Sequence, residues 1–200
     1  RLGALLIHYS TDYVFDGAKA EPYLEDDATN PLGVYGASKL EGERAIATSG
    51  ARHWIFRTSW VYAPRGKNFL LTILRLAREG KPLRVVADQF GAPTSAAMLA
   101  RATAQAISRL SPHNSPPPSG VYHLSAAGRT SWHGFACATL REFGLDNPVA
   151  AIPAEDYPLP AKRPANSVLD NSRLAAAFGI RLPGWEDGLR EAAATLQKPR

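Results

Sequence analysis

The sequence predicts an α/β fold with a mainly parallel sheet. Short apolar runs of strand length alternate with stretches of helical pattern over most of the 200 residues, and no internal repeat interrupts the alternation. Two of the apolar runs, residues 4–9 and 54–61, lead into polar and aromatic side chains. In sheets of this kind ligands bind beyond the carboxyl ends of the strands, so we expect a functional site at these two strand ends.

Capping and turn residues set the order of the expected elements. Pro31 precedes a helix that Gly50 ends, and Asn68 is a plausible N-cap for a helix that stops at Gly80. The expected strands are 4–9, 54–61, a short one within 82–95, 120–126 and 148–153. The expected helices are 34–48, Asn68 to Gly80, Thr94 or Ser95 to about Leu110, Ser131 to Gly144, 171–178 and 185–196. The expected loops are 16–32, 111–120 and 161–170.

Composition is that of a globular protein with room for a sizeable core. Apolar residues make up 45% and charged residues 20% of the sequence. The net charge of +5 favours an anionic ligand such as a phosphate ester, while scattered arginines without interleaved aromatic residues argue against nucleic acid as a partner. No apolar stretch has the roughly 18 residues that a membrane span needs, and no signal peptide is visible, so we expect no membrane partner and a cytoplasmic location.

The cysteine and the histidines carry no recognisable chemistry. Cys137 is the one cysteine of the sequence, which excludes an internal disulfide, and its apolar surroundings predict a buried structural thiol. The five histidines lack ligand spacing, so no metal site is expected.

A tyrosine and a lysine stand four residues apart at the start of the helix 34–48. Tyr35 and Lys39 share one face of that helix. A tyrosine ordinarily titrates near pH 10, and a neighbouring ammonium favours the phenolate, so such a pair can give a proton to a carbonyl oxygen. Ser10 or Thr11, at the end of the preceding strand, is placed to hold that oxygen. The helix pair alone also fits a solvated surface, but its position after a Ser-Thr strand end favours a catalytic site.

This arrangement resembles the short-chain dehydrogenase/reductase superfamily, whose extended members act on nucleotide sugars. The resemblance narrows to the dTDP-4-dehydrorhamnose reductase family, whose successive signature stretches the chain contains in order. These are STDYVFDG, NPLGVYGASKLEGE, RTSWVYA, NFLLTILRLAREGKPLRVVADQFGAPTS, GVYHLS and KRPANSVLDNSRL. The resemblance implies the C-terminal part of a Rossmann-like doubly wound parallel sheet plus a small substrate-binding lobe.

The family reduces the 4-keto group of dTDP-4-dehydro-L-rhamnose with NADPH or NADH, and the resemblance implies site residues for that reaction. Tyr35 is then the general acid, Lys39 its electrostatic partner and ribose anchor, and Thr11 the donor to the carbonyl oxygen. Ser10 is a further cofactor contact. The implied substrate contacts are Tyr13 and Trp60 at the sugar, Asn68 near the diphosphate, and Gln89, Arg163 and Asn166 at the nucleotide end. Some members of the family hold magnesium at a dimer interface, and no residue of this sequence can be matched to that magnesium site. The resemblance thus also allows a homodimer as a partner state.

The Gly-rich turn of a dinucleotide site does not follow the first strand of this chain. In the family that turn lies before the point where this sequence starts, so we expect a missing N-terminal portion, poor binding of NAD(P)H, and an exposed apolar edge on strand 4–9 that invites association. The expected division assigns 1–82 and 94–127 to the remaining nucleotide-binding domain, and 83–93 and 128–200 to the substrate lobe.

Two other functions remain open at this stage. The regulatory beta subunit of methionine adenosyltransferase shares the fold and similar motifs, and it acts by binding an enzyme. A nucleotide-sugar epimerase or dehydratase is the other alternative. Dehydratases carry Thr-Asp-Glu where this chain has Thr11, Asp12 and Tyr13, so the carboxylate that abstracts a proton from carbon is missing here.

Overall fold

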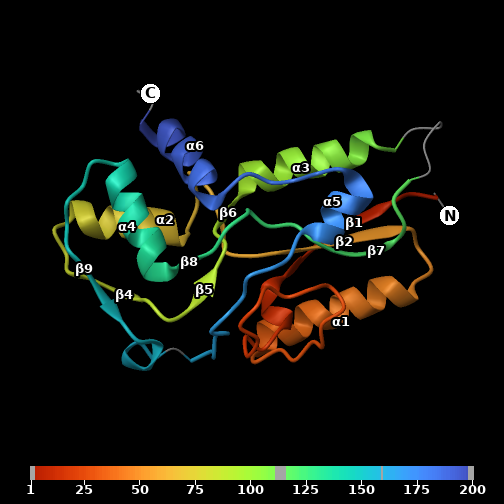
Figure 1. The fold of residues 1–200 in the computed structure, drawn as a ribbon, viewed down its shortest axis with the longest axis horizontal. Helices are drawn as coiled ribbons and strands as arrows, with labels where there is room; N and C mark the ends of the chain where they lie inside the picture. Colours follow the sequence, from red (N-terminus) through yellow and green to blue (C-terminus); the bar gives the residue numbers. More distant parts are fainter. Residues whose placement is uncertain (1–2, 111–115, 159, 198–200) are drawn as a thin grey trace.

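A parallel three-stranded sheet forms the centre of the larger part of the molecule (Figure 1). The structure, a computed structural model, describes residues 3–110, 116–158 and 160–197. β1 (Leu6–Thr11) pairs in parallel with β2 (His53–Thr58), which pairs in parallel with β7 (Gly120–His123). The register places Thr11 beside Thr58, so β1 and β2 end side by side. The expected α/β fold with a mainly parallel sheet is therefore confirmed.

Helices cover both faces of this sheet. α1 (Val34–Thr48) lies on one face, and α3 (Ala96–Ser108) and α5 (Ser172–Phe178) lie on the other (Figure 1). Ser95 is the N-cap of α3, since its side chain accepts a hydrogen bond from the amide of Met98. A doubly wound arrangement results, with each helix burying one face against the strands.

A smaller part of the fold packs α2 (Phe69–Arg78) and α4 (Trp132–Glu142) beside β4 (Leu83–Val86), which pairs in parallel with β9 (Val149–Ile152). α2 belongs to the segment 1–82 that was expected to lie with the large sheet, yet it packs on α4 and β4. The remaining elements are the 3-10 turns η1 (Asp12–Val14) and η2 (Ala154–Asp156), β3 (Val61–Tyr62) paired in parallel with β6 (Thr94–Ser95), β5 (Phe90–Gly91) paired antiparallel with β8 (Thr130–Ser131), and α6 (Trp185–Gln197).

The expected helices are confirmed closely, and the expected strands less so. The side chain of Asn68 accepts from the amide of Leu71, and Ser131 caps α4 in the same way. The first strand continues to Thr11 instead of ending at residue 9, and the second ends at Thr58 before a separate β3. Residues 82–95 hold three short strands rather than one, because the chain there crosses between the two parts of the fold. Part of the expected loop 111–120 lies outside the described residues.

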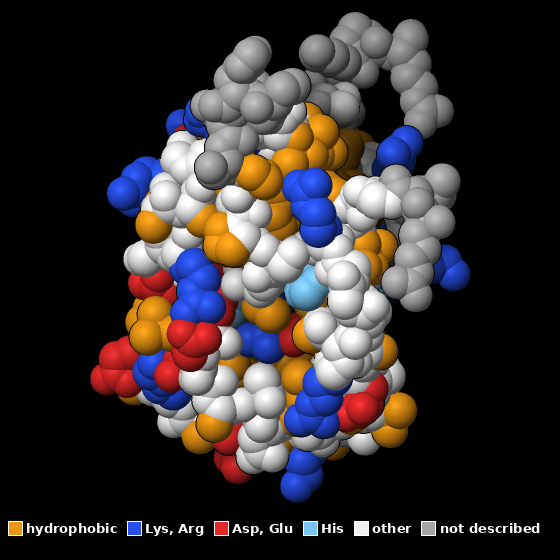
Figure 2. Space-filling view, turned by 90° about the vertical axis from the view of Figure 1, so that its right-hand side faces the viewer, with side chains coloured by type: hydrophobic (Ala, Val, Ile, Leu, Met, Phe, Trp, Pro, Cys, Tyr) orange, Lys and Arg blue, Asp and Glu red, His pale blue; other side chains and the backbone are white. Residues whose placement is uncertain are grey.

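Charged side chains on the end of the molecule that carries β1 are mixed in sign. Basic side chains are spread over this face, several of them beside acidic ones (Figure 2). β1 is an edge of the described sheet, and its Leu6 and Tyr9 are 42% and 38% exposed. No helix of the described residues is long and apolar enough to cross a membrane.

A buried ion pair joins α1 to the sheet. The guanidinium of Arg57 on β2 donates to both carboxylate oxygens of Glu43 on α1, with distances of 2.9 Å from Nε to Oε1 and 2.6 Å from Nη2 to Oε2. Both residues are only 4% exposed. A third donation, from Nη1 to the carbonyl oxygen of Glu25, reaches the loop that follows η1. This bidentate geometry fixes the position of the helix that carries Tyr35.

The same polar cluster extends to β7. The carboxylate of Glu25 accepts from the backbone amide of His123 at 2.8 Å, and the Arg173 guanidinium lies 3.6 Å from its other oxygen. His123 is fully buried, and burial lowers the pKa of its imidazole to about 3. The imidazole therefore stays neutral, and the loop, the sheet and α1 are connected through Arg57 and Glu25.

Breaking the buried pair should destabilise the protein strongly. Glu43→Gln leaves the Arg57 charge without its partner, and we expect the free energy of unfolding to fall by about 3–5 kcal/mol in urea denaturation. Replacing both members with apolar residues, as Arg57→Met with Glu43→Leu, should recover much of that loss. The control is Glu41→Gln, which removes an exposed pair with Arg44 on the same helix and should change stability by less than about 1 kcal/mol. Equal losses in the two single variants would contradict this account.

The neutral His123 should also make stability depend on pH. An unfolded histidine takes up a proton near pH 6.5, whereas folded His123 does so near pH 3. Within this window a falling pH favours the unfolded state by about 1.4 kcal/mol per pH unit. The raised pKa of Asp12, about 6, favours the folded state as the pH falls, which opposes the effect of His123. The difference in unfolding free energy between wild type and His123→Gln therefore isolates the contribution of the histidine. Unfolding curves at pH 7 and pH 4 should show wild type losing stability relative to the variant; parallel curves would refute the assignment.

Candidate active site at the ends of β1 and β2

A cavity of about 270 Å³ opens where β1 and β2 end. Four of the residues around it, Thr11, Tyr13, Tyr35 and Trp60, were expected to contact a keto sugar. Ser10, expected at the cofactor, lines it as well. The complete lining is Ser10, Thr11, Asp12, Tyr13, Tyr35, Thr58, Trp60, Val61 and Trp132. The fold thus brings together side chains that lie up to 122 positions apart in the sequence, from Ser10 to Trp132.

Hydrogen bonds to a buried carboxyl order the strand end. The Thr11 hydroxyl donates to Oδ1 of Asp12 at 2.9 Å, and the Ser59 hydroxyl donates to Oδ2 at 2.9 Å. The amide of Tyr13 in turn donates to Oγ1 of Thr11 at 3.2 Å. Asp12 is 2% exposed, and burial raises the pKa of its carboxyl to about 6, although hydrogen bonds from Ser167, Thr11 and Ser59 oppose the rise.

A glycine lets α1 approach this strand end. A Cβ added at Gly36 would lie 2.1 Å from the carbonyl oxygen of Tyr13, so any side chain there would push α1 away from η1. The close approach places the rings of Tyr13 and Tyr35 edge to face, with centroids 6.2 Å apart. Tyr35 is 58% exposed at the cavity and can reach a ligand. Gly36 in the VYGASK stretch is therefore a requirement of the site's geometry.

Lys39 lies one helical turn further along α1, beneath the cavity. Its ammonium donates to the carbonyl oxygen of Tyr9 at 2.5 Å and lies 3.3 Å from Nε2 of His8. Burial and the Lys39 charge lower the pKa of His8. The lysine does not line the cavity itself, but these contacts hold its charge against β1, on the helical face that Tyr35 shares.

Two tryptophans form one wall. The rings of Trp60 and Trp132 stack with centroids 3.5 Å apart and an angle of 4° between their planes. Trp60 has a φ of 49°, a left-handed conformation that is strained for such a residue, and its indole Nε1 donates to the Ser167 hydroxyl at 3.1 Å. Gly91 leaves room for this ring, since a Cβ there would lie 2.4 Å from it. The strain and the close packing show that the surrounding structure holds Trp60 in a single position.

The cavity also contains unused hydrogen-bonding capacity. Among the described residues, the buried hydroxyls of Ser10 and Thr58 have no hydrogen-bond partner. Both residues line the cavity. A buried polar atom without a partner is costly, so these hydroxyls suit a ligand with oxygen atoms in this space.

A second cavity, of about 450 Å³, lies between α2, β4 and the segment around Arg163. Gln89 and Arg163, both expected at the nucleotide end of a substrate, line it, together with Phe69, Arg84 and Tyr157. Trp132 lines this cavity as well as the first. The two spaces are therefore neighbours that share the Trp132 side chain.

The two expected asparagines line neither of these cavities. The Asn68 amide caps α2 and donates to the carbonyl oxygens of Ala63 and Arg65. The buried amide of Asn166 donates to the carbonyl oxygens of Lys19 and Glu21, so it fixes the loop after η1. Both side chains act within the protein in this structure.

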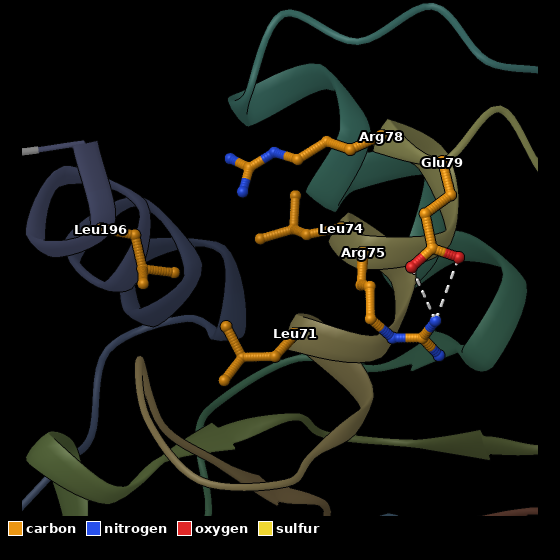
Figure 3. Close-up of a pocket in the computed structure, with 6 residues that line it drawn as sticks. All are labelled: Leu71, Leu74, Arg75, Arg78, Glu79 and Leu196. Carbon is orange, nitrogen blue, oxygen red and sulfur yellow. Dashed lines mark hydrogen bonds and ion pairs between the residues drawn. The ribbon is translucent and has the colours of Figure 1, made fainter.

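A third cavity, of about 300 Å³, lies between α2 and α6 (Figure 3). Leu196 of α6 points toward Leu71 and Leu74 of α2 across the space, and Arg75 turns away to pair with Glu79. Its lining is therefore mainly aliphatic at the centre, and it contains none of the residues expected at the site.

Four residues of the first cavity were not expected from the sequence. Asp12, Thr58, Val61 and Trp132 line it but were not among the expected site residues. The position of Asp12 directly after a strand end was the one available signal. The stacking partner of Trp60 comes from a helix that lies far along the chain, which no local pattern shows.

Cys137 differs slightly from expectation. Its thiol is half-buried and lies 3.6 Å from Nε2 of His133, one helical turn away. Burial raises the pKa of this thiol, which makes it a poor nucleophile. In the part of the chain that the structure describes, no group of three or more His, Cys, Asp or Glu side chains could hold a metal ion.

Comparison with known proteins identifies close sequence relatives. Residues 1–198 match the RmlD substrate binding domain family. The chain is 52% identical over 195 residues to a dTDP-4-dehydrorhamnose reductase from Burkholderia thailandensis, covering 92% of this chain and 65% of that protein. It is 49% identical over 195 residues to the enzyme of the same name from Escherichia coli, covering 94% of this chain and 64% of that protein. The chain thus spans about two thirds of the length of these relatives.

Solved structures agree with the sequence relatives. A dTDP-4-dehydrorhamnose reductase ortholog from Clostridium acetobutylicum superimposes with a TM-score of 0.90 at 38% identity, over 98% of this chain and 67% of that one. The dTDP-4-dehydrorhamnose reductase from Bacillus anthracis, solved in complex with NADP, gives a TM-score of 0.88 at 34% identity, over 96% of this chain and 66% of that one. The family model and these relatives agree with the site described above, in which the helix of Tyr35 and Lys39 lies beside the Ser10–Thr11 strand end. This protein belongs to the RmlD substrate binding domain family.

Proposed function

We propose that the gene product containing this chain reduces the 4-keto group of dTDP-4-dehydro-L-rhamnose to give dTDP-L-rhamnose, with a hydride from NADPH or NADH. Relatives named dTDP-4-dehydrorhamnose reductase, at 52% and 49% identity, support this activity. The NADP complex of the Bacillus anthracis protein supports the cofactor class. We propose that the reaction takes place in the cytoplasm.

The observation that carries the proposal is the first cavity. Thr11, Tyr13, Tyr35 and Trp60 all face it, and Lys39 lies one turn below Tyr35 on the same helix. Two hydroxyl donors and an aromatic wall suit a sugar ring that carries a carbonyl group. Tyr13 stands where a dehydratase needs a carboxylate, so the cavity favours reduction over elimination of water.

The residues present also fit the cofactor. The hydroxyl of Ser10, which has no partner within the described ranges, and the ammonium of Lys39 offer donors to ribose hydroxyls. When bound, NAD(P)H supplies the hydride that becomes the new hydrogen on carbon 4. The side chains of this chain position the keto group and transfer the proton.

Tyr35 is the general acid in this mechanism. Its hydroxyl gives a proton to the keto oxygen as that oxygen gains negative charge, and the product is a secondary alcohol. The charge of Lys39 stabilises the phenolate that remains, because an ammonium on the same helical face lowers its energy. Thr11 holds the keto oxygen with a hydrogen bond, which fixes the carbonyl group against Tyr35.

The nucleotide end of the substrate belongs in the second cavity under this proposal. Gln89 offers an amide for the base or the ribose, and Arg163 offers a cation for the diphosphate. Since Trp132 lines both spaces, a single extended ligand can occupy the two cavities together. Asn68, expected near the diphosphate, and Asn166, expected at the nucleotide end, line neither cavity, so this proposal gives them smaller roles.

Removing the Tyr35 hydroxyl tests the general acid. In the gene product that contains this chain, Tyr35→Phe should lower kcat for NAD(P)H oxidation with dTDP-4-dehydrorhamnose by about 10²–10⁴-fold, with KM changed much less. The control is Tyr9→Phe, whose hydroxyl contacts Thr103 of α3 away from the cavity. A wild-type protein that folds and binds a methionine adenosyltransferase but shows no turnover would contradict the reductase proposal.

Removing the Arg163 cation tests the nucleotide end. Arg163→Ala should weaken binding of dTDP about tenfold in calorimetric titration, and added salt should shrink the difference, because a charged hydrogen bond to phosphate is lost. Arg78→Ala, which removes an exposed cation from the third cavity, serves as the matched control. Equal effects of the two substitutions would place the diphosphate elsewhere.

A further inference from the structure

A buried carboxyl next to the active-site threonine has no role in the mechanism described so far. Asp12 is 2% exposed and lies directly after Thr11. It forms no ion pair among the described residues, and its contacts at 2.9 Å are the hydroxyls of Thr11 and Ser59. A carboxyl buried without a cation is costly when ionised.

The hydrogen bonds of Thr11 limit what its hydroxyl can do. A hydroxyl has one proton, and in this structure the Thr11 proton points to Oδ1 of Asp12. The amide of Tyr13 already donates to the same Thr11 oxygen. While Asp12 is ionised and can only accept, Thr11 has no proton left for a keto oxygen in the cavity.

Protonating Asp12 reverses this bond. A carboxyl with its proton on Oδ1 donates to the Thr11 oxygen, and the Thr11 proton is then released toward the cavity that Thr11 lines. A proton on Oδ2 would instead release the Ser59 hydroxyl, which is 0% exposed and does not line the cavity. A keto oxygen in the cavity therefore favours the proton on Oδ1.

We propose that Asp12 is a positioning residue that works in its protonated form and turns the Thr11 hydroxyl toward the substrate carbonyl. This inference rests on the proposed function, because it concerns the same keto oxygen. The Asp12 proton stays between Asp12 and Thr11 throughout, while the proton transferred to the product still comes from Tyr35. A neutral Asp12 also avoids placing a negative charge beside the oxygen that becomes negative during reduction.

Burial brings protonation of the Asp12 carboxyl into the mildly acidic pH range. It raises the pKa of Asp12 to about 6 against the opposing hydrogen bonds of Ser167, Thr11 and Ser59. Three other charged or titratable groups belong to this cluster: Tyr13, Arg163 and Tyr35. Burial and the Asp12 charge raise the pKa of Tyr13 to about 12, and the Arg163 charge opposes that rise.

The test compares the pH dependence of turnover in wild type and Asp12→Asn. An asparagine amide can donate to Thr11 at every pH, as protonated Asp12 does, while its oxygen accepts from Ser59. We expect wild-type kcat to fall about tenfold per pH unit above the pKa of Asp12, and the variant to lack this fall. Asp12→Ala, which restores no donor, should be slow at every pH. The control Asp26→Asn removes an exposed carboxylate paired with Arg173 and should keep the wild-type profile.

A titration without turnover provides the second readout. The carbon resonance of the Asp12 carboxyl in this chain should titrate well above pH 4, and Thr11→Val should raise its pKa further because a donor to the ionised form is lost. Thr72→Val removes a hydroxyl that donates to the Asn68 carbonyl oxygen at the start of α2, and it should leave the titration unchanged.

Two results would overturn the inference: a wild-type pH profile in Asp12→Asn, or an Asp12 pKa that does not respond to Thr11→Val. A wild-type protein without turnover would contradict the proposed function instead. In that case the titration still decides whether Asp12 controls the Thr11 hydroxyl.

Discussion

The buried pair between Arg57 and Glu43 is the constraint on which the active site depends. Arg57 lies on the central strand β2, and its guanidinium donates to Glu43 of α1 and to the carbonyl oxygen of Glu25 in the loop between η1 and α1. Burying two charges costs free energy, and good bidentate geometry offsets much of that cost. The directional bidentate geometry sets the position of α1 on the sheet.

The positions of the reacting groups follow from that anchor. With α1 fixed, Gly36 can lie against the Tyr13 carbonyl oxygen, and Tyr35 meets Tyr13 edge to face over the end of β1. On the opposite side, Trp60 is held in a strained conformation by Trp132 and Ser167. The cavity between these two sides is lined by tryptophan rings on one side and tyrosine rings on the other. Such preorganisation lowers the cost of aligning a carbonyl group with its proton donor.

Local patterns in the sequence were enough to predict the helices and to place Tyr35 and Lys39 on one helix beside the end of β1. Asn68, Ser95 and Ser131 cap helices as their positions indicate, because capping depends on neighbouring residues. Strand limits were less accurate, since Thr11 belongs to β1 only through its pairing with Thr58 on β2. Contacts between distant segments were out of reach: the Trp60–Trp132 stack, the Ser59 bond to Asp12, and the use of Asn166 within the loop all join residues that no periodicity relates.

Native-state hydrogen exchange of the α1 amides in wild type and Glu43→Gln would test the central claim most directly. If the Arg57–Glu43 pair fixes α1, the variant should lose more protection in α1 and in the loop after η1 than in α2 and α4 of the smaller part of the fold. Local opening of α1, beyond the general loss of stability, is the predicted result. Unchanged protection in α1, or an equal loss in every helix, would contradict the account.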